Sequence, residues 1–120
     1  MKKLTAVVYW IITVSYMVAI FYISSQKSVE LPPLPWGSDK VLHAVAYAVL
    51  GVLSYLSFKK SGLNKRVIAL SFFLAAIYGI TDEFHQSYVP GRNAAVGDVI
   101  ADAVGAFLGS YTADAISIRR

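Results

Sequence analysis

The stretch LTAVVYWIITVSYMVAIFYI, from Leu4 to Ile23, decides the fold. It carries no charged residue, and as a helix rising about 1.5 Å per residue it would cross the roughly 30 Å hydrocarbon core of a bilayer. The preceding Met1-Lys2-Lys3 resembles the start of a signal peptide. However, the apolar core of a cleaved signal has only roughly 7 to 15 residues, and no small-x-small cleavage site follows here. We therefore expect an uncleaved transmembrane helix over about residues 4–23.

The composition of the whole chain is typical of a membrane protein. Of its 120 residues, 57% are hydrophobic and 15% are charged, whereas a soluble domain usually carries about a quarter charged residues. The chain has no cysteine, which excludes disulfide frameworks, thiolate metal sites and a cysteine nucleophile.

Three further apolar segments follow, and the residues between them favour turns. The expected spans are 39–58, 67–86 and 94–118. Pro32, Pro33 and Pro35 precede the second span, where they prevent a continuing helix because proline lacks an amide donor and fixes φ. Pro90-Gly91 marks the end of the third span. The sequence therefore predicts an all-α fold, an integral membrane bundle of four transmembrane helices, as a single domain over residues 1–120.

The basic residues predict the orientation of this bundle. Most of them fall at the two termini and between the second and third spans: Lys2, Lys3, Lys59, Lys60, Lys65, Arg66, Arg119 and Arg120. The positive-inside rule then predicts that both termini are cytoplasmic. Topology thus accounts for the net charge of +4, and we expect no nucleic-acid partner. We expect most of the eight tyrosines to be anchors at the membrane interfaces.

The acidic residues gather on the opposite, extracytoplasmic side. Six of the seven acids lie there, together with both histidines: Glu30, Asp39, Asp82, Glu83, Asp98, Asp102, His43 and His85. Lys40 and Arg92 fall on the same side. An unpaired charge at the centre of a membrane costs at least about 2.5 to 3.5 kcal/mol, and less near the interface. These groups should therefore face one another or a wet cavity.

Helical spacing places the polar residues of each span on one face. They are Asp39, Lys40, His43 and Tyr47 on the second span, Asp82, Glu83 and Gln86 on the third, and Asp98 and Asp102 on the fourth. Below the last pair, Gly105 and Gly109 form a G-x-x-x-G pattern that allows two helix backbones to approach closely. Because Asp102 lies deepest on its span, it should be either protonated or paired with a cation. The spacing predicts a shared polar pocket at the outer end of the bundle.

The residue types in this pocket suggest roles. As candidate catalytic residues we take His43 as a base flanked by Asp39, with Asp82, Glu83 and Asp98 orienting it or holding a divalent cation. As candidate substrate-binding residues we take Lys40 and Arg92, which suit an anion, together with Tyr47, Gln86 and Asp102. We expect no cofactor; if a cation binds, a carboxylate cluster suits Mg²⁺, Ca²⁺ or Mn²⁺.

Two strings in the sequence resemble the VanZ-like membrane protein family. They are Asp39-Lys40-x-x-His43-x-x-x-Tyr47-x-x-Leu50-Gly51 and Asp82-Glu83-x-His85-Gln86-x-x-x-Pro90-Gly91-Arg92, followed by Asp98 and the paired glycines. The resemblance covers roughly residues 38–110 and implies that these polar residues are the family's characteristic ones. Asparagine is commoner in the family where this chain has Asp102.

The resemblance implies a location and a class of ligand. The location is the bacterial cytoplasmic membrane, with the polar site towards its extracytoplasmic side. Family members are associated with low-level resistance to teicoplanin and related lipoglycopeptides. An anionic envelope lipid or a lipoglycopeptide is therefore the expected partner, with membrane lipids around the bundle. The resemblance implies no particular reaction, so whether the chain is an enzyme stays open.

Two other functions fit the sequence. Aspartate and histidine along helices also build relays in proton- or solute-conducting proteins. However, the inner stretches Leu50 to Phe58 and Ala103 to Tyr111 have no ionisable side chain except tyrosine, and Asp114 is the one acid near the inner end. Alternatively, the chain is an accessory membrane subunit whose polar cluster fixes helix packing as a buried salt-bridge network.

Overall fold

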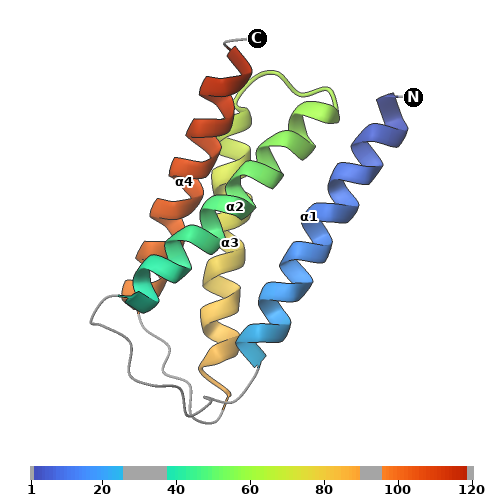
Figure 1. Cartoon of the computed structure of the whole chain (residues 1–120). Helices are drawn as coiled ribbons and strands as arrows, with labels where there is room; N and C mark the ends of the chain where they lie inside the picture. The colour runs from blue at the N-terminus through green and yellow to red at the C-terminus, as the bar shows by residue number, and fades with distance from the viewer. Residues whose placement is uncertain (1, 26–37, 90–95, 119–120) are drawn as a thin grey trace.

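A computed structural model describes residues 2–25, 38–89 and 96–118 (Figure 1). Within these residues the regular secondary structure is four α-helices and no strand, which confirms the all-α prediction. The helices are α1 (Lys2–Ser25), α2 (Ser38–Lys60), α3 (Val67–Gln86) and α4 (Val96–Ile118). α3 covers the range expected for the third span, and α4 lies within the range expected for the fourth, whose first two residues are outside the described part of the chain.

Each of the four helices in the described part of the chain is long and apolar enough to cross a membrane. Large apolar side chains are exposed on every helix, among them Ile11, Val41, Phe73 and Leu108. A soluble protein rarely leaves so much contiguous apolar surface open to water. We therefore treat the chain as a multi-pass membrane protein whose outer surface faces lipid.

Both ends of the chain lie at the same end of the bundle, beside the connection between α2 and α3 (Figure 1). The basic residues Lys59 and Lys60 are in the last turn of α2, next to that connection. The start of α2, the end of α3 and the start of α4 therefore meet at the other end, which we call the polar end. We call the end that carries Lys59 and Lys60 the basic end, and its cytoplasmic location stays a prediction.

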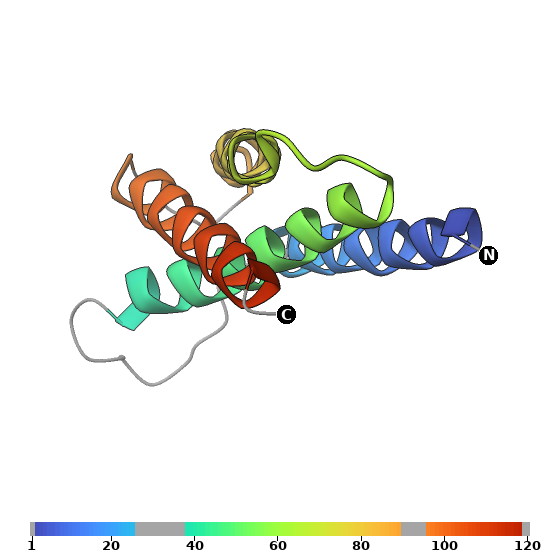
Figure 2. The same ribbon diagram turned by 90° about the horizontal axis from the view of Figure 1, so that it is seen from above.

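The closest helix contact is between α2 and α4, which are inclined to each other in both views (Figures 1 and 2). A Cβ added to Gly105 would lie 2.0 Å from the carbonyl oxygen of Ala44, and one added to Gly109 would lie 2.0 Å from that of Ala48. The two backbones therefore touch, as the G-x-x-x-G pattern predicts.

The apolar core lies at mid-height. Leu50, Ala75 and Ala106 are fully buried there, and Tyr47 packs against them from the polar end. Three of the four come from α2 and α4, and α3 supplies Ala75. Because two of the four residues are alanines, the three helices meet with little side chain between them.

Helix α1 is attached by hydroxyl groups as well as by apolar packing. Its buried residues are Thr13 and Ser24, and Met17 and Ile20 pack against the core. The Tyr16 hydroxyl donates to the backbone carbonyl of Ala46 at 2.7 Å, and Tyr78 of α3 donates to that of Met17 at 2.5 Å. The hydroxyls of Thr13 and Ser57 are 2.7 Å apart. In lipid, such interhelical hydrogen bonds supply part of the association that the hydrophobic effect supplies in water.

These bonds correct one expectation about the tyrosines. Tyr16 and Tyr78 hydrogen-bond across the bundle, and Tyr47 and Tyr55 are buried inside it. The prediction of interfacial anchors was wrong for these four. The hydroxyls of Tyr16 and Tyr78 are satisfied by a carbonyl of a neighbouring helix, and that of Tyr55 by the Asp114 carboxylate, instead of by interfacial water.

Replacing Gly105 by alanine tests the contact between α2 and α4. The added methyl group meets a backbone oxygen, which cannot move without separating the helices, so we expect a loss of at least about 2 kcal/mol of stability. Thermal unfolding in detergent, followed by circular dichroism, measures this. Val104→Ile also adds one carbon, but on the exposed face of α4, and it should leave the midpoint unchanged. Equal midpoints for the two variants would contradict the close contact.

Candidate functional site

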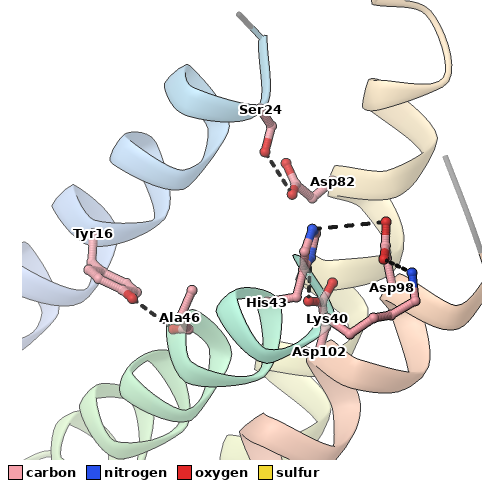
Figure 3. A network of polar contacts seen from close by, with 8 residues as sticks. All are labelled: Tyr16, Ser24, Lys40, His43, Ala46, Asp82, Asp98 and Asp102. Carbon is pink, nitrogen blue, oxygen red and sulfur yellow. Dashed lines mark hydrogen bonds and ion pairs between the residues drawn. The ribbon is translucent and has the colours of Figure 1, made fainter. Parts of the chain in front are cut away.

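The polar end brings together side chains from three helices around His43 of α2 (Figure 3). His43 Nδ1 donates to Asp102 Oδ1 of α4 at 2.9 Å. His43 Nε2 lies 3.9 Å from Oδ2 of Asp98, which is one turn nearer the start of α4 than Asp102. The imidazole therefore lies between two carboxylates of one helix, and the predicted facing of His43 and Asp98 is observed.

Lys40 occupies the more exposed side of this cluster. Its ammonium donates to Asp98 Oδ1 at 2.8 Å. The Lys40 side chain is 43% exposed, whereas the Asp98 side chain is 8% exposed. The aliphatic stem of Lys40 passes over Gly97, where an added Cβ would lie only 2.9 Å from Lys40 Cε. A cation thus lies at the surface of the cluster, above acids that are buried.

Helix α3 supplies the remaining acids. Asp82, Glu83 and Gln86 are all buried. One ligand atom from each of His43, Glu83 and Asp102 lies within 4.8 Å of the other two. The faces predicted to be polar on the second, third and fourth spans therefore meet, through His43, Glu83 and Asp102.

Helix α1 completes the cluster through a residue that the sequence analysis did not identify. Ser24 donates to Asp82 Oδ2 at 2.8 Å, and both side chains are buried. Figure 3 shows Asp82 between Ser24 and the imidazole of His43. In the sequence the only signal is a Ser24-Ser25 pair where the first apolar stretch ends, which also fits an ordinary helix end.

The neighbouring Ser25 fixes the second histidine. His85 Nε2 shares a hydrogen bond with the Ser25 hydroxyl at 2.8 Å, and the His85 ring stacks on Phe21 with centroids 4.3 Å apart. His85 therefore lies against α1.

The deepest part of the cluster is formed around Gly79. A Cβ at Gly79 would lie 3.0 Å from Asp102 Oδ2 and 3.2 Å from Tyr47 Cε2, so the absence of a side chain there leaves room for both groups. Asp102 is fully buried. Tyr47 Oη, Asp82 Oδ1 and Asp102 Oδ2 are buried here and have no hydrogen-bond partner among the residues that the structure describes.

Two of the predicted site residues are not placed by the structure. Arg92 lies outside the described residues, as does the side chain of Asp39, although its backbone belongs to α2. Their roles stay predictions. The carboxylate that the described residues place on His43 is Asp102, which the sequence analysis assigned to substrate binding and not to orienting the histidine.

The cluster can hold protons and cations, and it has an ammonium at its surface. Its acceptors are mainly carboxylate oxygens, and its imidazole can carry a proton on either nitrogen. A histidine held by a buried carboxylate is the arrangement that general bases and metal ligands share. The catalytic roles predicted for His43, Asp82, Glu83 and Asp98 are compatible with this geometry and stay predictions.

Together, the fold and the cluster define a small multi-pass membrane protein with a buried, acidic polar centre at one end of its helix bundle. The chain belongs to the VanZ/LLP1 family, whose family model matches residues 4–117. This match confirms the resemblance based on the two polar strings, and it extends over all four helices. No curated protein and no solved structure matches the chain.

Replacing Ser24 by alanine tests the contribution of α1 to the site. The substitution removes the hydrogen bond to Asp82 and leaves a buried carboxylate with less compensation, so we expect a loss of about 1 kcal/mol in stability. A double-mutant cycle with Asp82→Asn, measured by thermal unfolding, isolates the coupling. Thr112→Val removes an exposed hydroxyl that bonds within its own helix and is the control. A coupling of zero between Ser24 and Asp82 would show that the contact has no energetic role.

Proposed function

We propose that the chain binds the head group of an anionic envelope lipid or lipoglycopeptide at its polar end, on the extracytoplasmic side of the bacterial cytoplasmic membrane. The observation that carries this proposal is the position of Lys40, a partly exposed cation on the surface of a membrane-spanning bundle. Its position matches the depth at which phosphate and carboxylate head groups lie, near the end of a span.

The surface next to Lys40 suits an acyl chain. Val41, Leu42 and Val45 of α2 are all more than half exposed. Further along the same pair of helices, an open apolar groove of about 350 Å³ is lined by residues of α2 and α4, including Ala48, Val52 and Leu108. Ala48 follows Lys40 by two helical turns, or about 12 Å. A lipid with its head group on Lys40 can therefore extend its chain along the α2–α4 seam into this groove.

Lys40 can bind a further acceptor while it keeps its bond to Asp98. It is a compact charge with three donors on a flexible stem, and its side chain is partly exposed although that of Asp98 is buried. A phosphate or carboxylate arriving from the membrane can share the ammonium with Asp98. His43, whose side chain is 22% exposed, lies next to Lys40 and can donate a second hydrogen bond when protonated.

Family membership supports the choice of ligand class. Members are associated with resistance to teicoplanin, which combines acidic groups with a lipid chain. Binding such a molecule at the membrane surface would lower the amount that reaches its target. The same site would bind an envelope lipid of similar chemistry where no drug is present.

The conducting alternative receives less support. Leu50, Ala75 and Ala106 separate the polar end from the hydrogen-bonded pair Tyr55 and Asp114 near the basic end. Among the described residues, no ionisable side chain other than tyrosine bridges this layer. The accessory-subunit alternative agrees with the packing of the cluster, and the following experiment separates it from ligand binding.

Replacing Lys40 by glutamine tests the proposal. The variant keeps the stem and loses the charge, so we expect its affinity for an anionic phospholipid such as phosphatidylglycerol, and for teicoplanin, to fall about tenfold. Native mass spectrometry of the detergent-purified chain measures retained lipid, and titration of teicoplanin measures drug binding. Lys60→Gln removes a lysine of the same type at the opposite end of α2 and should bind as the wild type does.

Two results would contradict the proposal. If Lys40→Gln and Lys60→Gln bind both probes equally well, the polar end is not the site of binding. If Lys40→Gln instead unfolds at a much lower temperature than the wild type, the ion pair with Asp98 is structural and the accessory-subunit alternative is favoured.

A further inference from the structure

We infer that His43, Glu83 and Asp102 bind one divalent transition-metal ion, of the Mn²⁺ or Zn²⁺ class, inside the bundle. This site is distinct from the surface cation Lys40 and does not depend on the proposed function. It differs from the cation site suggested by the sequence, because it uses the imidazole and Asp102 in place of Asp82 and Asp98.

The three ligands come from three helices and already lie around one point. Each contributes one ligand atom, and these atoms are within 4.8 Å of one another. Neighbouring nitrogen or oxygen ligands at roughly 2.1 Å from a shared ion are about 3.0 to 3.4 Å apart in octahedral or tetrahedral coordination. The three atoms therefore have to approach one another by at most roughly 1 to 2 Å, a movement on the scale of side-chain rotation.

An unpartnered oxygen independently points to a ligand in this position. Asp102 is fully buried, its Oδ1 shares a hydrogen bond with His43, and its Oδ2 has no hydrogen-bond partner among the described residues. A buried acceptor without a partner loses its hydration and gains nothing in return, and the penalty is larger for a charged group. The buried Asp82 has a second such atom, Oδ1. A cation among these oxygens removes the penalty.

The charge of the cluster also favours a cation. Among the described residues, four buried carboxylates meet at the polar end: Asp82, Glu83, Asp98 and Asp102. The cationic groups described beside them are Lys40, and His43 and His85 when protonated. Within a membrane, uncompensated charges are expensive, and a divalent ion supplies two positive charges where the carboxylates are most deeply buried.

The ligand types select the ion. Mg²⁺ and Ca²⁺ prefer sites made entirely of oxygen, whereas an imidazole with two carboxylates suits Mn²⁺, Zn²⁺ or a similar ion. His43 Nδ1 and Asp102 Oδ1 now share a proton across 2.9 Å. The ion would take the place of this proton: a neutral imidazole would carry its proton on Nε2 instead, which faces Asp98 Oδ2 at 3.9 Å, and a protonated imidazole would release one proton to solvent.

Metal binding to the full chain in detergent tests the inference. The purified protein is stripped with EDTA and titrated with Mn²⁺, while electron paramagnetic resonance reports free ion, and equilibrium dialysis with elemental analysis repeats the measurement for Zn²⁺. We expect one ion per chain. Glu83→Gln and Asp102→Asn keep the shape of each side chain and should weaken binding roughly tenfold or more. Asp114→Asn removes a carboxylate bonded to Tyr55 at the other end and should bind as the wild type does.

The outcomes are decisive in both directions. A wild-type chain that binds neither ion at millimolar concentration overturns the inference, whatever the variants do. The inference is also overturned if Asp114→Asn weakens metal binding as much as the ligand variants do. Unchanged metal affinity in both Glu83→Gln and Asp102→Asn has the same meaning. Circular dichroism verifies that each variant is folded. Lys40→Gln should retain the metal ion while losing lipid, so failure of one proposal is distinguishable from failure of the other.

Discussion

A carboxylate buried inside a membrane must be neutralised or paired, and much of the arrangement of α2, α3 and α4 follows from this constraint at Asp102. His43 meets the constraint in part through its hydrogen bond to Asp102 Oδ1. Gly79 leaves space for the other oxygen. Because the paired groups belong to different helices, separating any two of these helices would expose a charge to lipid. The polar end therefore resists helix separation more strongly than apolar packing in lipid would.

The contact between α2 and α4 is what allows the histidine to reach its partner. Gly105 rests against Ala44, the residue after His43, and lies three positions after Asp102. Gly109 repeats the contact at Ala48, one turn further along both helices. Two contacts on successive turns fix both the distance and the register of the pair. A larger residue at either glycine would move Asp102 away from the imidazole, so the apolar seam and the polar cluster form one structural unit.

The sequence predicted those features that depend on length, charge and helical period. The four spans follow from apolar length, and the gathering of Asp82, Asp98 and His43 follows from spacing on three helices. The partner of His43 did not follow, because spacing shows which face a residue occupies and not its register against another helix. The role of Ser24 was also missed, since a single hydroxyl on an apolar helix gives almost no pattern.

The two sites proposed at the polar end would influence each other through charge. Without a metal ion, the carboxylates below Lys40 repel an approaching phosphate, and the ammonium is largely neutralised by Asp98. A divalent ion at His43, Glu83 and Asp102 would balance the charges of its two carboxylate ligands and so weaken the negative field below Lys40, because the buried charges act through a medium of low dielectric constant. An anionic head group would then meet the Lys40 ammonium with less repulsion from the carboxylates below it. In this arrangement the metal ion controls affinity without touching the lipid, and a chain depleted of metal would bind anions weakly even with Lys40 intact.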